Sequence, residues 1–405
     1  MKLDSRLLEQ LSQATRKLLG KGPAAATADI QAALRQKAAP AAAAAPAAQP
    51  AMRDINPPPG HATPPPEPQA TARPEPAAQP SPMDVMQNLM PDLMASFERA
   101  GFDSKGGFKM PNMPSFEVPG RRAPDSTLPG QFIDGSYSNA AGSRKYKLYV
   151  PASYQGKEAA LVVMLHGCTQ DPVDFATGTQ MNELAEEMGC LVLYPAQSQQ
   201  ANSSRCWNWF NALDQQRGQG EPSIIEGMTR EVMASHAVDR DQVYVAGLSA
   251  GGAMASIMGT LYPELYAAVG VHSGLPFASA HDLPSALAAM KGSIGKGAQQ
   301  GRSIPIIVFH GDRDTTVHPA NGDALIAQGA SRVAQPSGAE PGKVPQGHAY
   351  TRTAHHKPDG TLHAEHWLIH GAGHAWSGGS ANGSYTDGKG PNASREMMRF
   401  FTTRR

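Results

Sequence analysis

The chain has 405 residues, which allows two or three domains, and its 35 lysines and arginines are balanced by 35 aspartates and glutamates. A net charge of zero argues against a nucleic-acid-binding protein and against a polybasic protein of the membrane surface. No apolar run approaches the roughly 20 residues of a membrane-spanning helix, so we expect no transmembrane segment.

The N-terminal part predicts a short helix followed by a tether. Residues 1–20 have leucines spaced along one helical face, which predicts a short amphipathic helix. Charged residues interrupt these leucines, unlike the continuous apolar core of a secretory signal, and this favours a cytoplasmic location. Residues 21–82 are mostly Ala, Pro, Gln and Thr. Such a segment buries too little apolar surface to fold, so we expect a disordered tether.

Residues 83–130 predict a methionine-rich short helix and an irregular linker. Met83, Met86, Met90 and Met94 share helical spacing, and the region from 106 to 130 is rich in Gly and Pro. One interpretation is an arm that docks on the following domain or frays. The other is an adhesive face, so that the N-terminal helices contact a hydrophobic surface or partner.

The remaining residues, 131–405, alternate apolar runs with helical patterns. Strands are predicted at 145–150, 161–165, 190–194, 243–246, 267–272 and 304–309, and helices at 181–188, 224–235, 253–261 and 395–401. A turn at residues 358–360 separates 348–354 from 361–370 and predicts a hairpin. The middle strands are continuous Val/Ile/Leu runs, typical of strands buried on both faces. This order predicts an α/β fold with a mostly parallel central sheet and helices on both faces.

Ser249 lies in the segment Gly247-Leu248-Ser249-Ala250-Gly251-Gly252, between a predicted strand and a predicted helix. A strand, a sharp turn and a helix form the setting in which G-x-S-x-G makes a nucleophile elbow. Its glycines remove side chains that would clash in the crowded turn. The alternative is a helix N-terminus rich in small residues. We predict that Ser249 is a catalytic nucleophile.

A nucleophilic serine needs a base to take its proton and a carboxylate to orient that base, in the chain order Ser, Asp or Glu, His. Asp312 and Asp314 both lie in the loop after the strand that ends at Phe309, and both are candidates for the carboxylate. His374 is the candidate base, because it follows a strand and small residues flank it. The other histidines match no compact ligand pattern, so we expect neither a metal nor a cofactor.

An oxyanion hole needs two backbone N–H groups aimed where negative charge develops. One should come from Ala250, directly after the nucleophile. The other should come from the loop after residues 161–165, where Gly167 allows a sharp turn. We name Cys168 as this donor and Thr169 as the fallback.

Three cysteines are too few for a disulfide scaffold. Cys190 falls in a predicted buried strand and reads as a core residue. Cys168 and Cys206 fall in loops, and the sequence does not decide whether they form a disulfide bond. Such a bond would favour an oxidising compartment.

Aromatic residues crowd the segment 206–210, inside a loop rich in Ser, Asn and Gln. They either line a substrate cleft or plug the space under a long loop. We predict substrate contacts for Trp207, Trp209 and Trp376.

Taken together, these motifs resemble the polyhydroxybutyrate (PHB) depolymerase family of esterases, within the α/β-hydrolases. The matching segments are 165–170, 206–210, 243–254, the loop with Asp314, and 373–376. The resemblance spans about residues 131 to 403 and implies carboxylic ester hydrolysis through Ser249, Asp314 and His374. It thereby favours Asp314 over Asp312. It also implies a polyester or small ester as substrate, namely short-chain polyhydroxyalkanoates.

Two features depart from secreted members of that family, because neither a signal peptide nor an appended substrate-binding domain is recognisable. The family points to an extracellular protein, so the compartment is left open. Feruloyl and acetyl-xylan esterases are close relatives and supply an alternative activity. A non-catalytic protein that binds hydrophobic surfaces is an alternative of another class.

Overall fold

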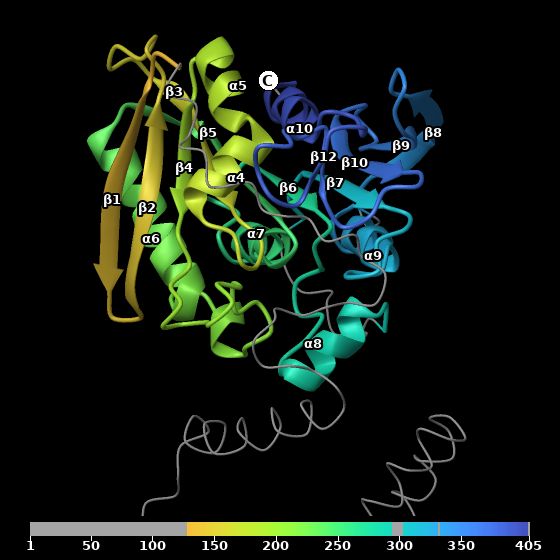
Figure 1. Cartoon of the computed structure of the whole chain (residues 1–405), viewed down its shortest axis with the longest axis horizontal. Helices are drawn as coiled ribbons and strands as arrows, with labels where there is room; N and C mark the ends of the chain where they lie inside the picture. The colour runs from red at the N-terminus through yellow and green to blue at the C-terminus, as the bar shows by residue number, and fades with distance from the viewer. Residues whose placement is uncertain (1–127, 294–302, 331–332, 404–405) are drawn as a thin grey trace, which may run out of the picture. The chain divides into compact units, whose positions relative to one another are not determined.

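The computed structural model describes residues 128–293, 303–330 and 333–403 (Figure 1). The predicted N-terminal helix, the tether and the methionine-rich element lie outside these residues. Within the described part of the chain, no helix is long and apolar enough to cross a membrane.

A ten-stranded sheet forms the centre, in the order β1-β2-β4-β3-β5-β6-β7-β10-β9-β8. The parallel middle strands are β3 (Ala159–Leu165), β4 (Leu191–Pro195), β5 (Val238–Leu248), β6 (Ala268–His272), β7 (Ile306–Gly311) and β10 (Leu362–Ile369). The edges are antiparallel and consist of β1 (Gln131–Asn139), β2 (Gly142–Val150), β8 (Gln335–Lys343) and β9 (Ala349–His356). The predicted mostly parallel sheet and the predicted hairpin are both confirmed.

Alternate residues of the central strands enter two separate cores, one on each face of the sheet. In β3, Val163 joins the core under α6 (Gly220–Ser235), α7 (Ala250–Leu261), α8 (Leu283–Met290) and α9 (Ala320–Gly329). Val162 and Met164 join the opposite core, under α4 (Pro172–Thr179), α5 (Met181–Met188) and α10 (Ala393–Thr402). Figure 1 shows the sheet between these two groups of helices. Burial on both faces explains why the middle strands have no polar alternation.

Backbone hydrogen bonds hold the loops at the carboxyl edge of the sheet side by side. The Ser249 N–H donates to the His272 carbonyl, and the Ser273 N–H donates to the Phe309 carbonyl. The Asp312 N–H donates to the Ile369 carbonyl. The segments that leave β5, β6, β7 and β10 therefore meet at one edge, where ligands bind in open α/β sheets.

Eight described elements lie outside the sequence-based prediction: β1, α4, the short helix η1 (Leu213–Gln215), α8, α9, β8, β11 (Trp376–Ser377) and β12 (Thr386–Asp387). The clearest case is β8, whose sequence QPSGAEPGK has neither β-branched residues nor apolar alternation. It is almost wholly exposed, and among the described strands it pairs with β9 alone. Its strand conformation comes from ladder hydrogen bonds with β9, which local sequence does not reveal.

Candidate active site

Ser249 occupies a sharp turn between β5 and α7. Its φ of 57° and ψ of −120° are unusual for a residue with a side chain. The glycines around it are required by contact: a Cβ at Gly251 would lie 2.0 Å from the Leu165 carbonyl oxygen, and one at Gly247 would lie 2.4 Å from the Gly251 backbone. This is the geometry of a nucleophile elbow. An ordinary helix N-terminus rich in small residues would need neither the positive φ of Ser249 nor the close backbone approach at Gly251.

Asp314 and His374 form a direct pair at the same sheet edge. The His374 Nδ1 lies 2.7 Å from Asp314 Oδ2. The other oxygen of Asp314 accepts hydrogen bonds from the backbone N–H groups of Thr316, at 2.9 Å, and Val317, at 2.8 Å. The aspartate side chain is fully buried and the histidine side chain is 12% exposed. A buried carboxylate that orients one ring nitrogen leaves the other free to act as a base.

Two opposing effects set the charge of Asp314. Burial by itself would raise the pKa of its carboxyl, but hydrogen bonds from His310 and His374 outweigh burial, and the pKa falls well below its usual value. His310 Nε2 lies 3.4 Å from Asp314 Oδ2 and donates to the Val317 carbonyl at 2.8 Å. Asp314 is therefore ionised at neutral pH.

Asp312, the competing carboxylate, has a different partner. Its Oδ2 lies 3.0 Å from His370 Nδ1, and its Oδ1 accepts the Gly371 N–H at 2.7 Å. His370 Nε2 in turn lies 2.8 Å from the hydroxyl of Thr351. Asp312 thus fastens the loop after β7 to the loop after β10, and no hydrogen bond or ion pair joins it to His374.

Both predicted oxyanion donors have free N–H groups. Neither Cys168 nor Ala250 donates its backbone N–H to any partner among the described residues. Ala250 is the first residue of α7, whose N-terminus favours negative charge. Thr169, the fallback donor, gives its N–H to the Ser204 carbonyl at 2.6 Å. The hydrogen-bond pattern therefore favours Cys168 over Thr169.

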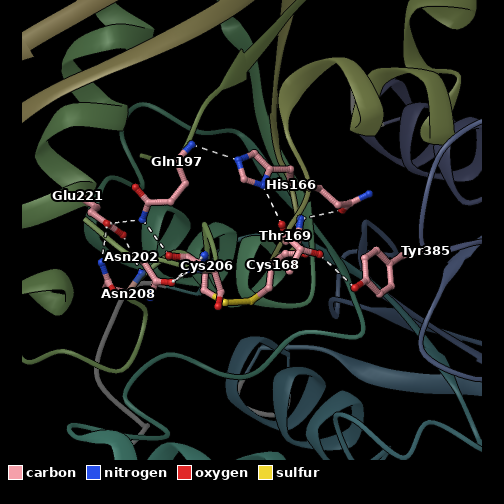
Figure 2. The surroundings of a disulfide bond; sticks show 12 residues. His166, Cys168, Thr169, Gln197, Asn202, Cys206, Asn208, Glu221 and Tyr385 are labelled. Atoms are coloured by element: carbon pink, nitrogen blue, oxygen red, sulfur yellow. Dashed lines mark hydrogen bonds between the residues drawn. A yellow bond between two sulfur atoms is a disulfide. The ribbon is translucent and has the colours of Figure 1, made fainter. Parts of the chain in front are cut away.

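Cys168 and Cys206 form a disulfide bond, which the sequence had left open (Figure 2). It joins the loop after β3 to the aromatic segment 206–210 across 38 residues of chain. Cys190 is a buried free cysteine, as predicted. The loop that carries the candidate oxyanion donor is thus covalently tied to its neighbour.

The prediction that Trp207 and Trp376 contact substrate is not met. Trp207 is 0% exposed and packs against the His166 ring, with centroids 5.6 Å apart. Trp376, in β11 (Trp376–Ser377), is 1% exposed, stacks on His272 and donates its Nε1–H to the Ser394 hydroxyl. Neither ring presents a surface to a ligand, because both fill the core beneath the site. Trp209 is 6% exposed, so it offers a ligand little surface to contact.

Tyr385 is an aromatic residue beside the site that sequence reasoning missed. It is 47% exposed, and its hydroxyl lies 3.1 Å from the Thr169 hydroxyl (Figure 2). Its carbonyl accepts the Trp376 N–H, two residues from His374. It lies just before β12 (Thr386–Asp387), in a Ser/Gly-rich stretch without apolar patterning, so no local signal marked it.

Within the residues placed by the structure, no group of three or more His, Cys, Asp or Glu side chains could hold a metal ion. The hairpin histidines make other contacts: His348 lies 2.8 Å from Asp387, and His363 is buried beside the Ser303 hydroxyl. His348 and His363 thus have partners within the fold.

A mostly parallel sheet with helices on both faces, a serine elbow after β5 and an Asp–His pair at the same edge define an α/β-hydrolase. An acetyl xylan esterase from Aspergillus awamori has this fold, with a TM-score of 0.50 at 22% identity. The similarity covers 64% of this chain and 93% of that one.

Residues 144–334 match the model of the family described as esterase PHB depolymerase. This stretch includes Ser249 and Asp314 and ends before His374, so the similarity to the family covers part of the site.

Two curated relatives are similar over the same region. A poly(3-hydroxyalkanoate) depolymerase C from Paucimonas lemoignei is 34% identical over 48% of this chain and 49% of its own length. A probable acetylxylan esterase A from Aspergillus fumigatus is 31% identical over 45% of this chain and 53% of its own length. The chain thus spans about half the length of these relatives.

Proposed function

We propose that this protein is a serine esterase that hydrolyses poly(3-hydroxybutyrate) or short-chain polyhydroxyalkanoate oligomers. The observation that carries the proposal is the hydrogen bond between His374 and a fully buried Asp314, at the sheet edge where the elbow presents Ser249. Each part of a serine hydrolase site thereby has a candidate residue.

The proposed reaction follows from these roles. The Ser249 hydroxyl attacks the ester carbonyl while His374 takes its proton, and Asp314 stabilises the imidazolium that forms. Negative charge on the former carbonyl oxygen is met by the N–H groups of Cys168 and Ala250. Collapse breaks the ester bond, and His374 returns the proton to the leaving alcohol. Water then attacks the acyl-serine with His374 as base and releases the acid.

Ser249→Ala tests the reaction. We expect hydrolysis of p-nitrophenyl butyrate to fall at least about 10³-fold, because no acyl intermediate can form. Far-ultraviolet circular dichroism should stay unchanged. Labelling of the unmodified protein by a fluorophosphonate, absent in the variant, gives an independent readout. Retention of most activity by the variant would remove Ser249 from the mechanism.

The substrate class rests on the depolymerase relative, and the acetylxylan esterase relative supports a second candidate. One purified sample should be compared on hydroxybutyrate oligomers, acetylated xylan and methyl ferulate, with products identified by mass. We expect the highest kcat/KM on the oligomers. A higher kcat/KM on acetylated xylan or methyl ferulate would assign the protein to the second candidate while leaving the serine mechanism intact.

A further inference from the structure

Tyr385 is the most exposed aromatic residue among those that the structure describes, with 47% of its surface accessible. Its backbone nevertheless adopts a φ of 53°, in the left-handed region that bulky residues rarely enter. Such strain persists only where the surroundings hold a residue in place, and it is concentrated at functional sites. Tyr385 is thus an exposed side chain on a backbone that its neighbours fix.

Two contacts fasten Tyr385 to the loops that carry the candidate oxyanion donor and the candidate base. The Thr169 hydroxyl donates to the Cys168 carbonyl at 2.6 Å, so it accepts from the Tyr385 hydroxyl, at 3.1 Å (Figure 2). The Tyr385 carbonyl accepts the Trp376 N–H at 2.7 Å, two residues from His374. The tyrosine therefore bridges these two loops.

Ser384, directly before the tyrosine, is held by side chains of the loop after β3 and of α4. Gln170 Nε2 donates to the Ser384 carbonyl at 3.1 Å, and Asp174 Oδ1 accepts the Ser384 N–H at 2.9 Å. Gln170 Oε1 also accepts the Gly167 N–H at 2.9 Å. These bonds are made within the protein, so the position of the tyrosine is set before a substrate arrives. This lowers the entropic cost of binding.

The roles proposed for the site define where an ester lies. Its carbonyl carbon meets the Ser249 hydroxyl, its carbonyl oxygen faces the Cys168 N–H, and its leaving oxygen lies within reach of His374. The ester therefore occupies the space between the loops of Cys168 and His374, and Tyr385 is bonded to both loops. A polyester continues beyond the scissile bond in both directions, so its neighbouring units leave this space over its rim.

The tyrosine ring suits such a chain chemically. Thr169 holds the Tyr385 hydroxyl, which leaves the ring as the part that a ligand can cover. A 3-hydroxybutyrate unit carries a methyl group and a methylene group and no charge, and such groups pack well on an aromatic face. The tryptophans near the site are at most 6% exposed, so Tyr385 is the aromatic residue there with the most surface to offer.

We propose that Tyr385 is a substrate-binding residue that selects polyester chains, its ring packing on a 3-hydroxybutyrate unit that flanks the scissile ester. This inference rests on the proposed function and deepens it, because it names a residue that distinguishes a chain from a small reagent. The hydroxyl holds the ring against Thr169 and takes no part in the chemistry.

Tyr385→Gly and Tyr385→Phe test the contact with two reagents. The trimer of 3-hydroxybutyrate carries flanking units, whereas diisopropyl fluorophosphate reacts with a nucleophilic serine and carries none. Glycine removes the ring and adopts a positive φ without strain, so Tyr385→Gly should fold, with unchanged circular dichroism.

Burial of one or two methylene-sized groups is worth about a tenfold change in affinity, so kcat/KM for the trimer should fall about 10-fold in Tyr385→Gly. The rate of inactivation by diisopropyl fluorophosphate should change less than about threefold, because Ser249 and its partners stay in place. Tyr385→Phe keeps the ring and should keep kcat/KM for the trimer within about threefold. Ile133→Ala, which truncates a 41% exposed side chain on the edge strand β1, is the control and should keep both rates.

The two reagents separate failure of this inference from failure of the proposed function. If diisopropyl fluorophosphate does not inactivate the unmodified protein, the proposed function fails. If it does but the trimer is not hydrolysed, the substrate class is wrong, and the role of Tyr385 fails with it while the serine mechanism survives.

Three results with an active unmodified protein would overturn the role of Tyr385 alone. One is a Tyr385→Gly variant that keeps kcat/KM for the trimer. Another is an equal loss with both reagents, since that would mark a residue that only supports the loop of Cys168. The third is an equal loss of kcat/KM in the Phe and Gly variants, which would assign the effect to the hydroxyl rather than to the ring.

Discussion

Asp312 and Asp314 are two residues apart, yet the fold gives them different surroundings. Asp314 is fully buried and pairs with His374, whereas the Asp312 side chain is 34% exposed and pairs with His370. The two Asp–His pairs join the same two loops. A carboxylate can orient a catalytic imidazole only where water does not compete for it, so the buried pair is the stronger candidate.

Asp314→Asn against Asp312→Asn is a matched test of this distinction. An amide at 314 stabilises neither the required tautomer nor the imidazolium, so kcat should fall about 10³- to 10⁴-fold. Asp312→Asn should cost less than about tenfold, because His374 keeps its partner. Steady-state kinetics on p-nitrophenyl butyrate at pH 7 measure both. A larger loss in Asp312→Asn would reverse the assignment.

The same pair predicts an acid limit of stability. The folded-state pKa of Asp314 lies below its unfolded value of about 4. Its contribution to folding is therefore fully present above about pH 4 and is lost as the pH falls below it. Urea unfolding of the unmodified protein and of Asp314→Asn should give a stability difference that shrinks between pH 6 and pH 3. A difference that is constant over this range would contradict the assignment.

At the scale of elements, the contact between β5, α7 and β3 depends on glycine. A Cβ at Gly251 would fall 2.0 Å from the Leu165 carbonyl oxygen and 2.6 Å from that of His166, both of them backbone atoms. β3 cannot shift without breaking its pairing with β4 and β5, and the buried face of α7 is packed against its neighbours, so the elbow tolerates no side chain there.

Gly251→Ala should therefore lower the free energy of unfolding by about 3 kcal/mol or more, through a backbone clash that cannot relax. Gly373→Ala is the control, because a Cβ there meets nothing within 4 Å. It should change stability by less than about 0.5 kcal/mol. Chemical denaturation of both variants measures the difference, and equal stability would show that the elbow adapts.

The disulfide joins two loops that carry no regular structure of their own. Closing 38 residues of chain stabilises the folded state by about 4 kcal/mol in the loop-entropy account. We expect a reductant to lower the free energy of unfolding by about 2–4 kcal/mol. Thiol titration of the denatured, unreduced protein should find one thiol, that of Cys190. Three thiols would show that the bond is absent.

At the scale of the whole molecule, Glu365 of β10 links the sheet to the C-terminal helix. Its carboxylate is fully buried and binds Arg352 of β9, at 2.7 Å, and Arg399 of α10. It also accepts the Trp367 Nε1–H at 2.9 Å. The same helix also contacts the middle of the sheet, where Phe401 of α10 stacks on Tyr244 of β5, with ring centroids 4.6 Å apart.

Glu365→Ala should lower the free energy of unfolding by about 3 kcal/mol, because it removes the buried acceptor that two partly buried arginines and an indole N–H share. Glu340→Ala removes the other carboxylate on Arg352, one that is 66% exposed. It should cost less than about 1 kcal/mol. Thermal or urea unfolding compares them, and similar losses would show that burial of Glu365 adds nothing.

Much of the fold could be predicted because its signals are local. Continuous apolar runs marked the middle strands, and helix 181–188 has the predicted bounds. The glycines around Ser249 marked the elbow, since close backbone approach demands them. The edge strand β8 could not be predicted, because its conformation depends on pairing with β9 rather than on its own side chains.

The candidate site divides in the same way. Ser249, His374 and the loop with Cys168 stand out in the sequence, because turn chemistry and the order of motifs along the chain single them out. Three outcomes depend on segments far apart in the chain: which aspartate pairs with His374, whether Cys168 bonds Cys206, and whether each tryptophan is buried or exposed. Those outcomes are set by long-range packing and burial, and only the tertiary structure decides them.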